Sequence, residues 1–302
     1  MILDKIASDL VLPRDYLLRV VWTASHRYKT YTIPKRSGGA RIINHPAREL
    51  KLLQYWVLEN VCSRLKIHDA ATAYRNGRNI RDHAAIHLRQ NYILKVDFRD
   101  FFPSIRKNDV LRVLREHVDV LKDSLEGEPD RDSVCRILCR GEQLTIGAPT
   151  SPILSNAVMF DFDTNWTKRS VELGVVYSRY ADDVYFSTST ANVLAPLLDE
   201  LRKDLHQRDS PRLQINDEKT AFTSRKRRRL ITGLVLTPTF RISLSRHRKR
   251  VMKSLVFSFL TDRLTKQQTD SLRGLIAYAR SVEPSFVESL RRKYGERVIT
   301  LL

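Results

Sequence analysis

Apolar residues along this 302-residue chain recur at two spacings, one typical of helices and one typical of strands. Apolar positions repeat every three or four residues in segments that we predict to be helical, namely 14–25, 46–65, 106–140 (with an acidic, polar interruption at 126–130), 153–162 and 191–205. Short runs rich in β-branched and aromatic residues predict strands at 28–34, 40–44, 92–96, 213–216 and 230–236. Three further helices are predicted at 246–260, 265–282 and 284–295. The pattern therefore predicts an α+β body followed by a helical C-terminal module.

The segment 175–187 carries two such strand-like runs around an acidic turn, which is the pattern of a β-hairpin. The turn holds two adjacent carboxylates, Asp182 and Asp183. Like charges this close are unfavourable unless a cation lies beside them, and oxygen ligands suit Mg²⁺ or Mn²⁺. An isolated Asp-Asp pair is more often a solvated turn. Here Asp97 closes the apolar run 92–96 and supplies a third carboxylate, so the sequence predicts a metal site that holds phosphates.

The charge of the chain favours a polyanionic partner. Lys and Arg number 53 against 34 Asp and Glu, a formal net charge of +19. Residues 225–253 alone contain 11 Lys and Arg and no acidic residue. Such a balance is typical of proteins that bind RNA, DNA or an anionic membrane surface. The hydrophobic fraction of 42% fits a globular protein that can form one large domain or two linked ones.

Membrane insertion and secretion are not expected. No apolar run approaches the roughly 20 residues of a membrane span. The N-terminal residues are interrupted by charges and lack the apolar core of a signal peptide. Three cysteines are too few for a disulfide framework, and we interpret Cys135 and Cys139 as buried thiols. We expect a reducing cytoplasm.

Two loops are candidates for binding phosphates. A cationic turn between the strands at 28–34 and 40–44 contains Lys35, Arg36, Ser37, Gly38 and Gly39, with Arg41 just beyond it. This hairpin either clamps a triphosphate or is a solvated hairpin in a basic protein. The Gly/Pro-rich loop 146–152 opens a helix, where free backbone N–H groups can bind a phosphate or a templating strand.

A histidine pair lies in the polar segment 72–91. His83 and His87 are four residues apart, the spacing that places two metal ligands on one face of a helix. The Glu that follows the first His in zinc proteases is absent. We therefore favour a pair that makes hydrogen bonds or contacts RNA.

Taken together, these motifs resemble those of reverse transcriptases over nearly the whole chain. Tyr180, Ala181, Asp182 and Asp183 resemble the catalytic hairpin of the palm, and the segment from Asp97 to Phe102 resembles the first catalytic strand. Residues 147–152 resemble the loop that faces template and nucleotide, and residues 33–41 resemble the fingers hairpin. Four motifs in the family's order are far more specific than any single one.

Among reverse transcriptases, the chain is most similar to the bacterial retron type. The segment 83–87 resembles the Asn-Ala-x-x-His element of retron enzymes, with His83 where Asn is usual. Residues 231–233 resemble their Val-Thr-Gly element, with Ile231 in place of Val. Ile146 stands where many reverse transcriptases have Gln, which leaves open how the nucleotide sugar is contacted.

The resemblance implies a fold and a reaction. The fold is that of a right-hand polymerase, with fingers and an antiparallel palm sheet packed on helices in residues 1–243 and a helical thumb in residues 244–302. The reaction is RNA-directed DNA polymerisation with two Mg²⁺ ions, for which Mn²⁺ is a possible substitute. The implied catalytic and metal-binding carboxylates are Asp97, Asp182 and Asp183. Lys219 matches a proposed general acid for pyrophosphate, although a Lys in this position is usually solvated.

Further roles follow from the same resemblance. Lys35, Arg41, Phe102 and Gly147 are implied in nucleotide binding. Phe102 would exclude a 2′-hydroxyl, and core packing is the alternative for this side chain. The nucleic-acid contacts implied are His87, Tyr180, Thr232, Gly233, Arg246, Arg248, Lys249 and Arg250.

For a retron enzyme the implied partners are a structured noncoding RNA that is both template and primer, its DNA product, deoxynucleoside triphosphates and an effector protein encoded alongside. The product would be branched, RNA-linked single-stranded DNA (msDNA), made in the bacterial cytoplasm as part of defence against phage, with no membrane involved.

Two alternative functions stay open at this point. The first alternative is another bacterial reverse transcriptase, of the group II intron or abortive-infection type. The second is a catalytically idle RNA-binding scaffold. No endonuclease or maturase segment follows residue 302, which disfavours the intron type. The complete set of three aspartates disfavours the scaffold.

Overall fold

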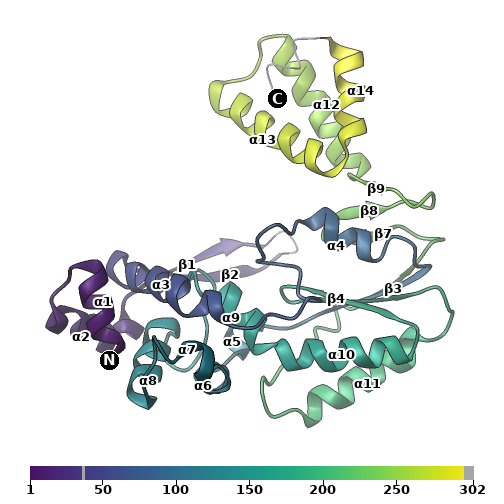
Figure 1. The fold of residues 1–302 in the computed structure, drawn as a ribbon. Coiled ribbons are helices and arrows are strands. Elements are labelled where there is room, and N and C mark those ends of the chain that lie inside the picture. Colours follow the sequence, from purple (N-terminus) through teal and green to yellow (C-terminus); the bar gives the residue numbers. More distant parts are fainter. Residues whose placement is uncertain (36–37, 296–302) are drawn as a thin grey trace. The chain divides into compact units, whose positions relative to one another are not determined.

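The computed structural model describes residues 1–35 and 38–295 (Figure 1). Contacts within the chain divide it into two compact units. Unit 1 comprises Met1–Asn76, Lys95–Tyr185 and Ala195–Thr220, and unit 2 comprises Gly77–Leu94, Phe186–Leu194 and the described residues from Ala221 onward. The predicted division after residue 243 falls inside unit 2 and stays a prediction.

A helical cluster forms the first part of unit 1. Its elements include α1 (Ile2–Leu10), α2 (Arg14–Trp22), α3 (Arg48–Asn60) and α8 (Glu128–Leu138), which contact one another. Each helix buries an apolar stripe, as with Ile2, Leu3 and Ile6 of α1. Unit 1 also contains η1 (Ala24–His26), η2 (Cys62–Arg64), α5 (Phe101–Ser104), α6 (Lys107–Glu116) and α7 (Val118–Leu121).

The predicted basic hairpin is present in unit 1. Strands β1 (Tyr28–Pro34) and β2 (Ala40–Pro46) pair antiparallel, in register from Tyr28 opposite Pro46 to Pro34 opposite Ala40. Arg36 and Ser37 of the predicted turn lie outside the described residues.

The central sheet has the strand order β4-β5-β3-β6, with β4 (Val176–Tyr180), β5 (Asp183–Thr188), β3 (Tyr92–Asp97) and β6 (Ala221–Ser224). Helix α10 (Phe160–Glu172) packs on β4, and α9 (Ser151–Val158) precedes it. The aromatic ring of Phe98, just after β3, meets Phe162 of α10 edge to face at 5.9 Å. Helix α11 (Leu194–Gln207) lies along α10, joined to it by Trp166 Nε1 donating to Asp204 (Figure 1).

Two predicted strands differ from the structure. Residues 213–216 do not form a strand, because only Ile215 bridges to Phe98 and the chain then turns, with Thr220 N donating to Asn216 O. The run 230–236 is a hairpin of β7 (Arg229–Ile231) and β8 (Leu234–Leu236), extended by β9 (Ile242–Ser243). Thr232 and Gly233 have φ values of 46° and 80°, the left-handed backbone of a two-residue hairpin turn.

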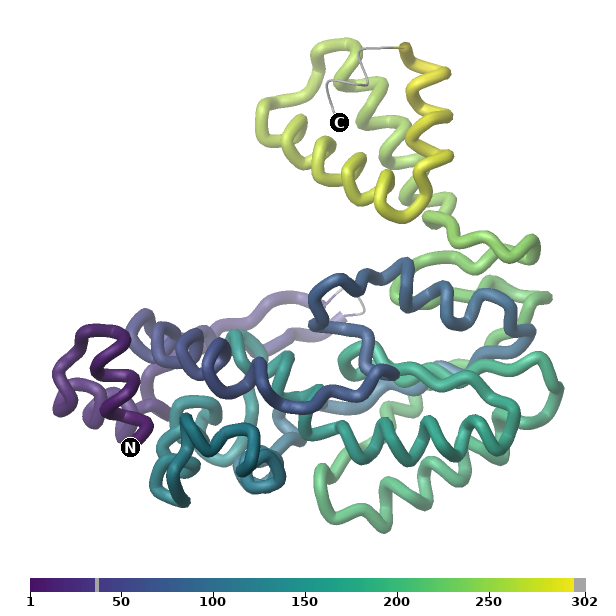
Figure 2. Tube along the Cα trace, in the orientation of Figure 1, coloured from purple at the N-terminus to yellow at the C-terminus, as the bar shows by residue number. Residues whose placement is uncertain are grey.

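Unit 2 ends in three packed helices, as predicted: α12 (Arg246–Leu260), α13 (Lys266–Val282) and α14 (Pro284–Tyr294). Their traces run from green to yellow in Figure 2. Ser245 and Thr265 cap the first two, each side-chain oxygen accepting a backbone N–H of the first turn. Unit 2 also contains helix α4 (Ile80–Ile86). No helix in the described part of the chain is long and apolar enough to cross a membrane.

Candidate active site

The acidic turn lies between β4 and β5 in unit 1. Ala181 has a φ of 58°, a left-handed conformation that is unfavourable for a residue with a Cβ. This residue and Asp182 reverse the chain, and Asp183 begins β5. The two adjacent carboxylates therefore occupy the tip of a tight hairpin, as the sequence predicts.

Asp97, the last residue of β3, lies beside this turn. The backbone N–H of the next residue, Phe98, donates to the carbonyl of Asp182 at 3.1 Å. The Asp97 side chain is 5% exposed. Its Oδ1 accepts from Lys219 Nζ at 2.8 Å and from Asn216 Nδ2 at 3.1 Å. Unit 1 thus brings together all four residues predicted to be catalytic.

The carboxylates of the turn are electrostatically strained when ionised. Burial raises the pKa of Asp182, and the charge of Asp97 raises it further. Burial also raises the pKa of Asp183 to about 6, although the neighbouring Lys95 acts to lower it. A cation bound between Asp182 and Asp183 would stabilise the ionised form of both carboxylates.

Lys95 is part of this site and was missed by the sequence analysis. Its Nζ lies 2.8 Å from Asp183 Oδ1, and it also lies 5.9 Å from the ring centroid of Tyr185. The Tyr185 hydroxyl contacts Asp183 Oδ2 at 3.3 Å. A signal existed in the sequence, because a cation two positions before Asp97 shares its face of a strand that is otherwise mostly apolar.

The donor set suits a divalent ion in its chemistry. Within residues 1–35 and 38–295, no three acidic, histidine or cysteine side chains are grouped to hold a metal as they stand. Lys219 and Lys95 instead neutralise Asp97 and Asp183. Carboxylate oxygens are nevertheless the hard ligands that Mg²⁺ and Mn²⁺ prefer, and, after burial, the charges of Asp182 and Asp97 both raise the pKa of Asp183, so a bound cation would relieve their repulsion.

The predicted nucleotide-binding cations lie on the basic hairpin. Lys35 and Arg41 are exposed, and the backbone N–H of Lys35 donates to Gly39 O at 2.9 Å. Tyr74, which the sequence analysis missed, lies in the electrostatic field of both Arg41 and Asp182. Burial and then the charge of Asp182 raise the pKa of Tyr74, whereas Arg41 lowers it, so both charges lie within electrostatic reach of this phenol.

Gly147 is held by close packing. Its φ is 117°, and a Cβ added there would lie 2.6 Å from the carbonyl oxygen of Asn44 in β2. The backbone N–H of Asn44 donates to Ile146 O at 2.8 Å. The loop before α9 is therefore joined directly to the basic hairpin.

Two aromatic residues that the sequence assigns to the site, Phe102 and Tyr180, are half-buried. Phe102 lies in α5, its ring centroid 5.5 Å from that of Phe101, so the geometry is compatible with both the packing alternative and the nucleotide-contacting role. Tyr180 is the last residue of β4, and burial raises its pKa.

The remaining predicted contacts belong to unit 2. His87 is fully buried and its Nδ1 lies 2.7 Å from Ser187 Oγ, so the hydrogen-bonding interpretation describes it. Burial holds its pKa well below the usual range. Thr232 and Gly233 form the β7–β8 turn.

The basic residues at the start of α12 fall into two groups. Arg246 and Arg250 are exposed. Arg248 donates to the Tyr278 hydroxyl at 2.7 Å, and Lys249 pairs with Glu283 at 2.6 Å.

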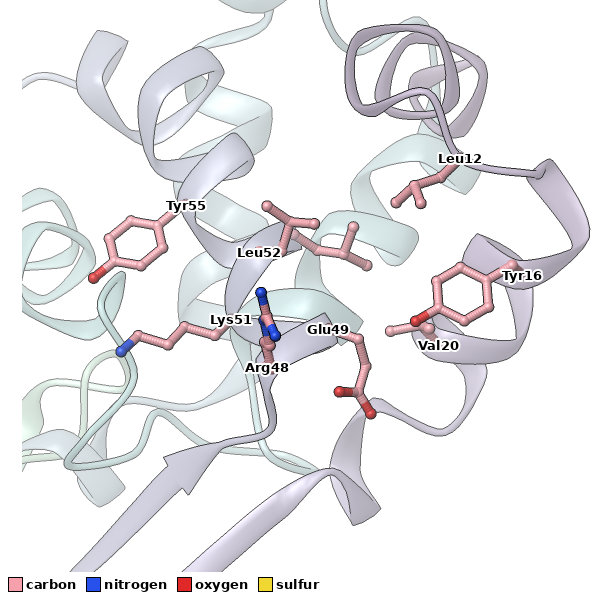
Figure 3. A pocket seen from close by; sticks show the side chains of 9 residues that line it. Leu12, Tyr16, Val20, Arg48, Glu49, Lys51, Leu52 and Tyr55 are labelled. Atoms are coloured by element: carbon pink, nitrogen blue, oxygen red, sulfur yellow. The ribbon is translucent and has the colours of Figure 1, made fainter.

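An apolar pocket of about 490 Å³ lies elsewhere in unit 1 (Figure 3). Leu12, Tyr16 and Val20 line one side, and Leu52 and Tyr55 of α3 line the other. None of the predicted site residues lines it.

Residues 33–266 match the family described as reverse transcriptase (RNA-dependent DNA polymerase). The chain belongs to the reverse transcriptases. The curated relatives it matches place it in the retron type. It is 38% identical to the retron Ec83 reverse transcriptase of Escherichia coli, over 91% of this chain and 89% of that protein. It is 32% identical to the retron Ec73 reverse transcriptase of E. coli, over 89% of this chain and 88% of that protein.

The fold of this reverse transcriptase also resembles a solved structure. The telomerase of Candida tropicalis, in complex with a fragment of telomeric RNA, superposes with a TM-score of 0.54 at 14% identity. The match covers 88% of this chain and 54% of that longer chain. The reverse transcriptase is accordingly an RNA-directed DNA polymerase with the predicted α+β polymerase fold.

Proposed function

We propose that this reverse transcriptase copies a cognate structured noncoding RNA into branched, RNA-linked single-stranded DNA. The likeness to retron reverse transcriptases over nearly the whole chain supports this product. The chemistry is supported by one observation above all, the gathering of Asp97, Asp182, Asp183 and Lys219 around one turn. The RNA would serve as template and primer, with synthesis starting from an internal guanosine 2′-hydroxyl.

In the proposed reaction the primer hydroxyl attacks the α-phosphate of a deoxynucleoside triphosphate, and pyrophosphate leaves. Two Mg²⁺ ions, or Mn²⁺ in their place, would supply Lewis acidity to the attacking hydroxyl and charge neutralisation to the leaving group. Asp97 and Asp182 would hold both ions, and Asp183 would support them.

Lys219 is suited to the leaving group. Its ammonium is half-exposed and lies 2.8 Å from Asp97, whose hydrogen bond raises the pKa of Lys219. It would therefore be fully protonated at neutral pH and able to donate a proton to the departing pyrophosphate.

The incoming nucleotide would be held by the basic hairpin and the loop joined to it. Lys35 and Arg41 would bind the triphosphate, and the loop at Gly147 would face the nucleotide. Phe102 would lie under the sugar and select deoxynucleotides.

Residues 1–243 would be fingers and palm, and residues 244–302 a thumb that grips the template–product duplex. We place the enzyme in the bacterial cytoplasm, in an anti-phage defence system with an effector protein encoded alongside it. Nothing in this proposal involves a membrane.

The test is to purify the protein from cells that carry its native locus and to analyse the bound nucleic acid on denaturing gels. A discrete DNA that shifts after ribonuclease and again after debranching treatment is the expected result. Unbranched DNA would instead assign the enzyme to another bacterial type. RNA without DNA, even with deoxynucleotides and Mg²⁺ supplied, would overturn the proposal.

The site is tested with the Asp182→Ala/Asp183→Ala variant. We expect this variant to bind RNA and to make no DNA, because the carboxylates act on the chemical step. Retained polymerisation would refute the assignment.

A further inference from the structure

We propose that Arg179 is a positioning residue for polymerisation, which holds the carbonyl of Ala181 and thereby fixes the carboxylates of Asp182 and Asp183. The inference rests on the proposed catalytic role of those two aspartates. All the groups involved belong to unit 1.

Arg179 lies beneath the acidic turn in a fully buried ion pair. Both Arg179 and its partner, Asp163 of α10, are 0% exposed. Arg179 Nε donates to Asp163 Oδ1 at 2.9 Å, and Nη2 donates to Oδ2 at 2.6 Å. The Tyr177 hydroxyl donates to the same carboxylate at 2.6 Å. The guanidinium is therefore fixed to α10 by a bidentate pair.

The other side of the guanidinium reaches the turn. Arg179 Nη1 donates to the carbonyl of Ala181 at 3.0 Å and to Asn156 Oδ1 at 3.1 Å. Because the guanidinium is planar and rigid, fixing one edge on Asp163 fixes the direction of the other edge. The carbonyl that precedes Asp182 is thereby tied to helices α9 and α10.

A neighbouring segment locks the same arrangement. Asn156 Nδ2 donates to Ala73 O at 2.8 Å. The backbone N–H of Arg179 donates to Ala70 O at 2.8 Å, and its carbonyl accepts from Thr72 N at 2.9 Å and Thr72 Oγ1 at 3.0 Å. Both the side chain and the backbone of Arg179 are thus held from outside the hairpin.

This anchoring opposes two forces that act on the turn. The left-handed conformation of Ala181, with a φ of 58°, is disfavoured for a residue with a Cβ. The ionised carboxylates that follow repel each other and Asp97. A catalytic constellation has to be held to within about 0.5 Å, so a turn free to relax would lose rate.

The experiment compares full-length variants in primer extension on poly(rA)·oligo(dT) with dTTP and Mg²⁺, together with thermal unfolding. Arg179→Lys retains the charge but not the fork of donors. At an assay temperature well below the Tm of the variant, we expect its kcat to be about 10- to 100-fold lower than that of the wild type. Its KM for dTTP should change by less than about threefold.

Adding Ala181→Gly to Arg179→Lys provides the decisive readout, because glycine adopts a positive φ without strain. We expect the kcat of the double variant to be several-fold higher than that of Arg179→Lys, while its Tm stays below that of the wild type. A purely structural role would leave kcat unrestored, and that result would overturn the inference. An Arg179→Lys variant with the kcat of the wild type would overturn the inference as well.

Arg169→Lys is the matched control, since Arg169 of α10 makes a similar fork with Glu200, at 2.6 and 2.9 Å, away from the hairpin. We expect its kcat to equal that of the wild type.

Should Arg179→Lys fail to fold, Asn156→Ala removes an acceptor of Nη1 and leaves the ion pair intact. Its kcat should fall by about 3- to 10-fold, and an unchanged kcat would overturn the inference.

Asp182→Ala separates the two proposals. Polymerisation by that variant would refute the catalytic site itself. An inactive Asp182→Ala beside fully active Arg179→Lys and Asn156→Ala variants would refute only the positioning role.

Discussion

At the scale of single residues, Asp183 shows how the proposed site opposes the stability of the free protein. Its pKa is raised to about 6 by burial, whereas an unfolded Asp titrates near 4. The native state therefore binds more protons than the unfolded state between these values. Stability falls as the pH rises through this window, and the penalty is fully present above about pH 6.

Replacing this carboxylate with an amide removes the penalty. In chelator at pH 7.5, Asp183→Asn should raise the free energy of unfolding by about 2 kcal/mol, and the gain should vanish below about pH 4. Urea denaturation across this pH range measures it. Asp119→Asn, at an exposed position, should change nothing. A loss of stability in Asp183→Asn at pH 7.5 would contradict the argument.

Phe102 offers a second test at this scale. If its ring excludes the 2′-hydroxyl, Phe102→Ala should incorporate ribonucleotides at least about tenfold better relative to deoxynucleotides, since a steric barrier is worth about 1–3 kcal/mol. Competition between ATP and dATP in primer extension measures this ratio. An unchanged ratio with lowered Tm would show that Phe102 only packs against Phe101.

At the scale of elements, the packing of the loop before α9 against strand β2 requires that residue 147 has no side chain, as is the case for Gly147. Gly147→Ala would place a methyl group 2.6 Å from Asn44 O at a φ of 117°. We expect a loss of about 2–4 kcal/mol in unfolding free energy, from the clash and the strained backbone together.

Gly274→Ala is the control for that substitution. Gly274 lies within α13, and a Cβ there would have no neighbour within 4 Å. Alanine at this helical position should stabilise by about 0.5–1 kcal/mol. Chemical denaturation of both variants should therefore give opposite signs, and equal effects would contradict the packing assigned to Gly147.

The same elements show what periodicity can predict. Helices α12, α13 and α14, the basic hairpin and the acidic hairpin follow from local patterns of apolar residues and turns. Residues 230–236 were predicted to form one strand but form a hairpin. The turn at Thr232 and Gly233 is only two residues long, so the segment is still mostly apolar and resembles a single strand. Gly233 was the available signal.

The site was predictable where its residues carry local motifs and not where they depend on tertiary contacts. Asp97 and Asp182 end or follow recognisable strands. Nothing in the local sequence around Arg179 shows that it is buried, because its charge is neutralised by the carboxylate of Asp163, 16 residues away in the chain.

At the scale of the whole molecule, the net charge of +19 favours a polyanionic partner, and the start of α12 provides accessible cations for it. Arg246 and Arg250 are exposed and lie one helical turn apart, so both can reach phosphates on one side of a duplex. Lys249 is different, because it holds Glu283 at 2.6 Å, and its loss would weaken folding as well. Only the first pair reports on nucleic-acid binding alone.

We therefore expect Arg246→Ala/Arg250→Ala to weaken binding of an RNA–DNA duplex at low salt. The slope of log K against log salt should become shallower by up to about 2, one for each phosphate that an arginine no longer neutralises. Fluorescence anisotropy from 50 to 300 mM salt gives both quantities, and Tm should stay within about 2 °C of the wild type, as expected for exposed side chains. Lys5→Ala/Arg19→Ala removes the same charge from exposed positions of α1 and α2 and should leave the slope unchanged. Equal slopes for the α12 variant and the wild type would exclude these arginines from the duplex interface, whatever the overall affinity.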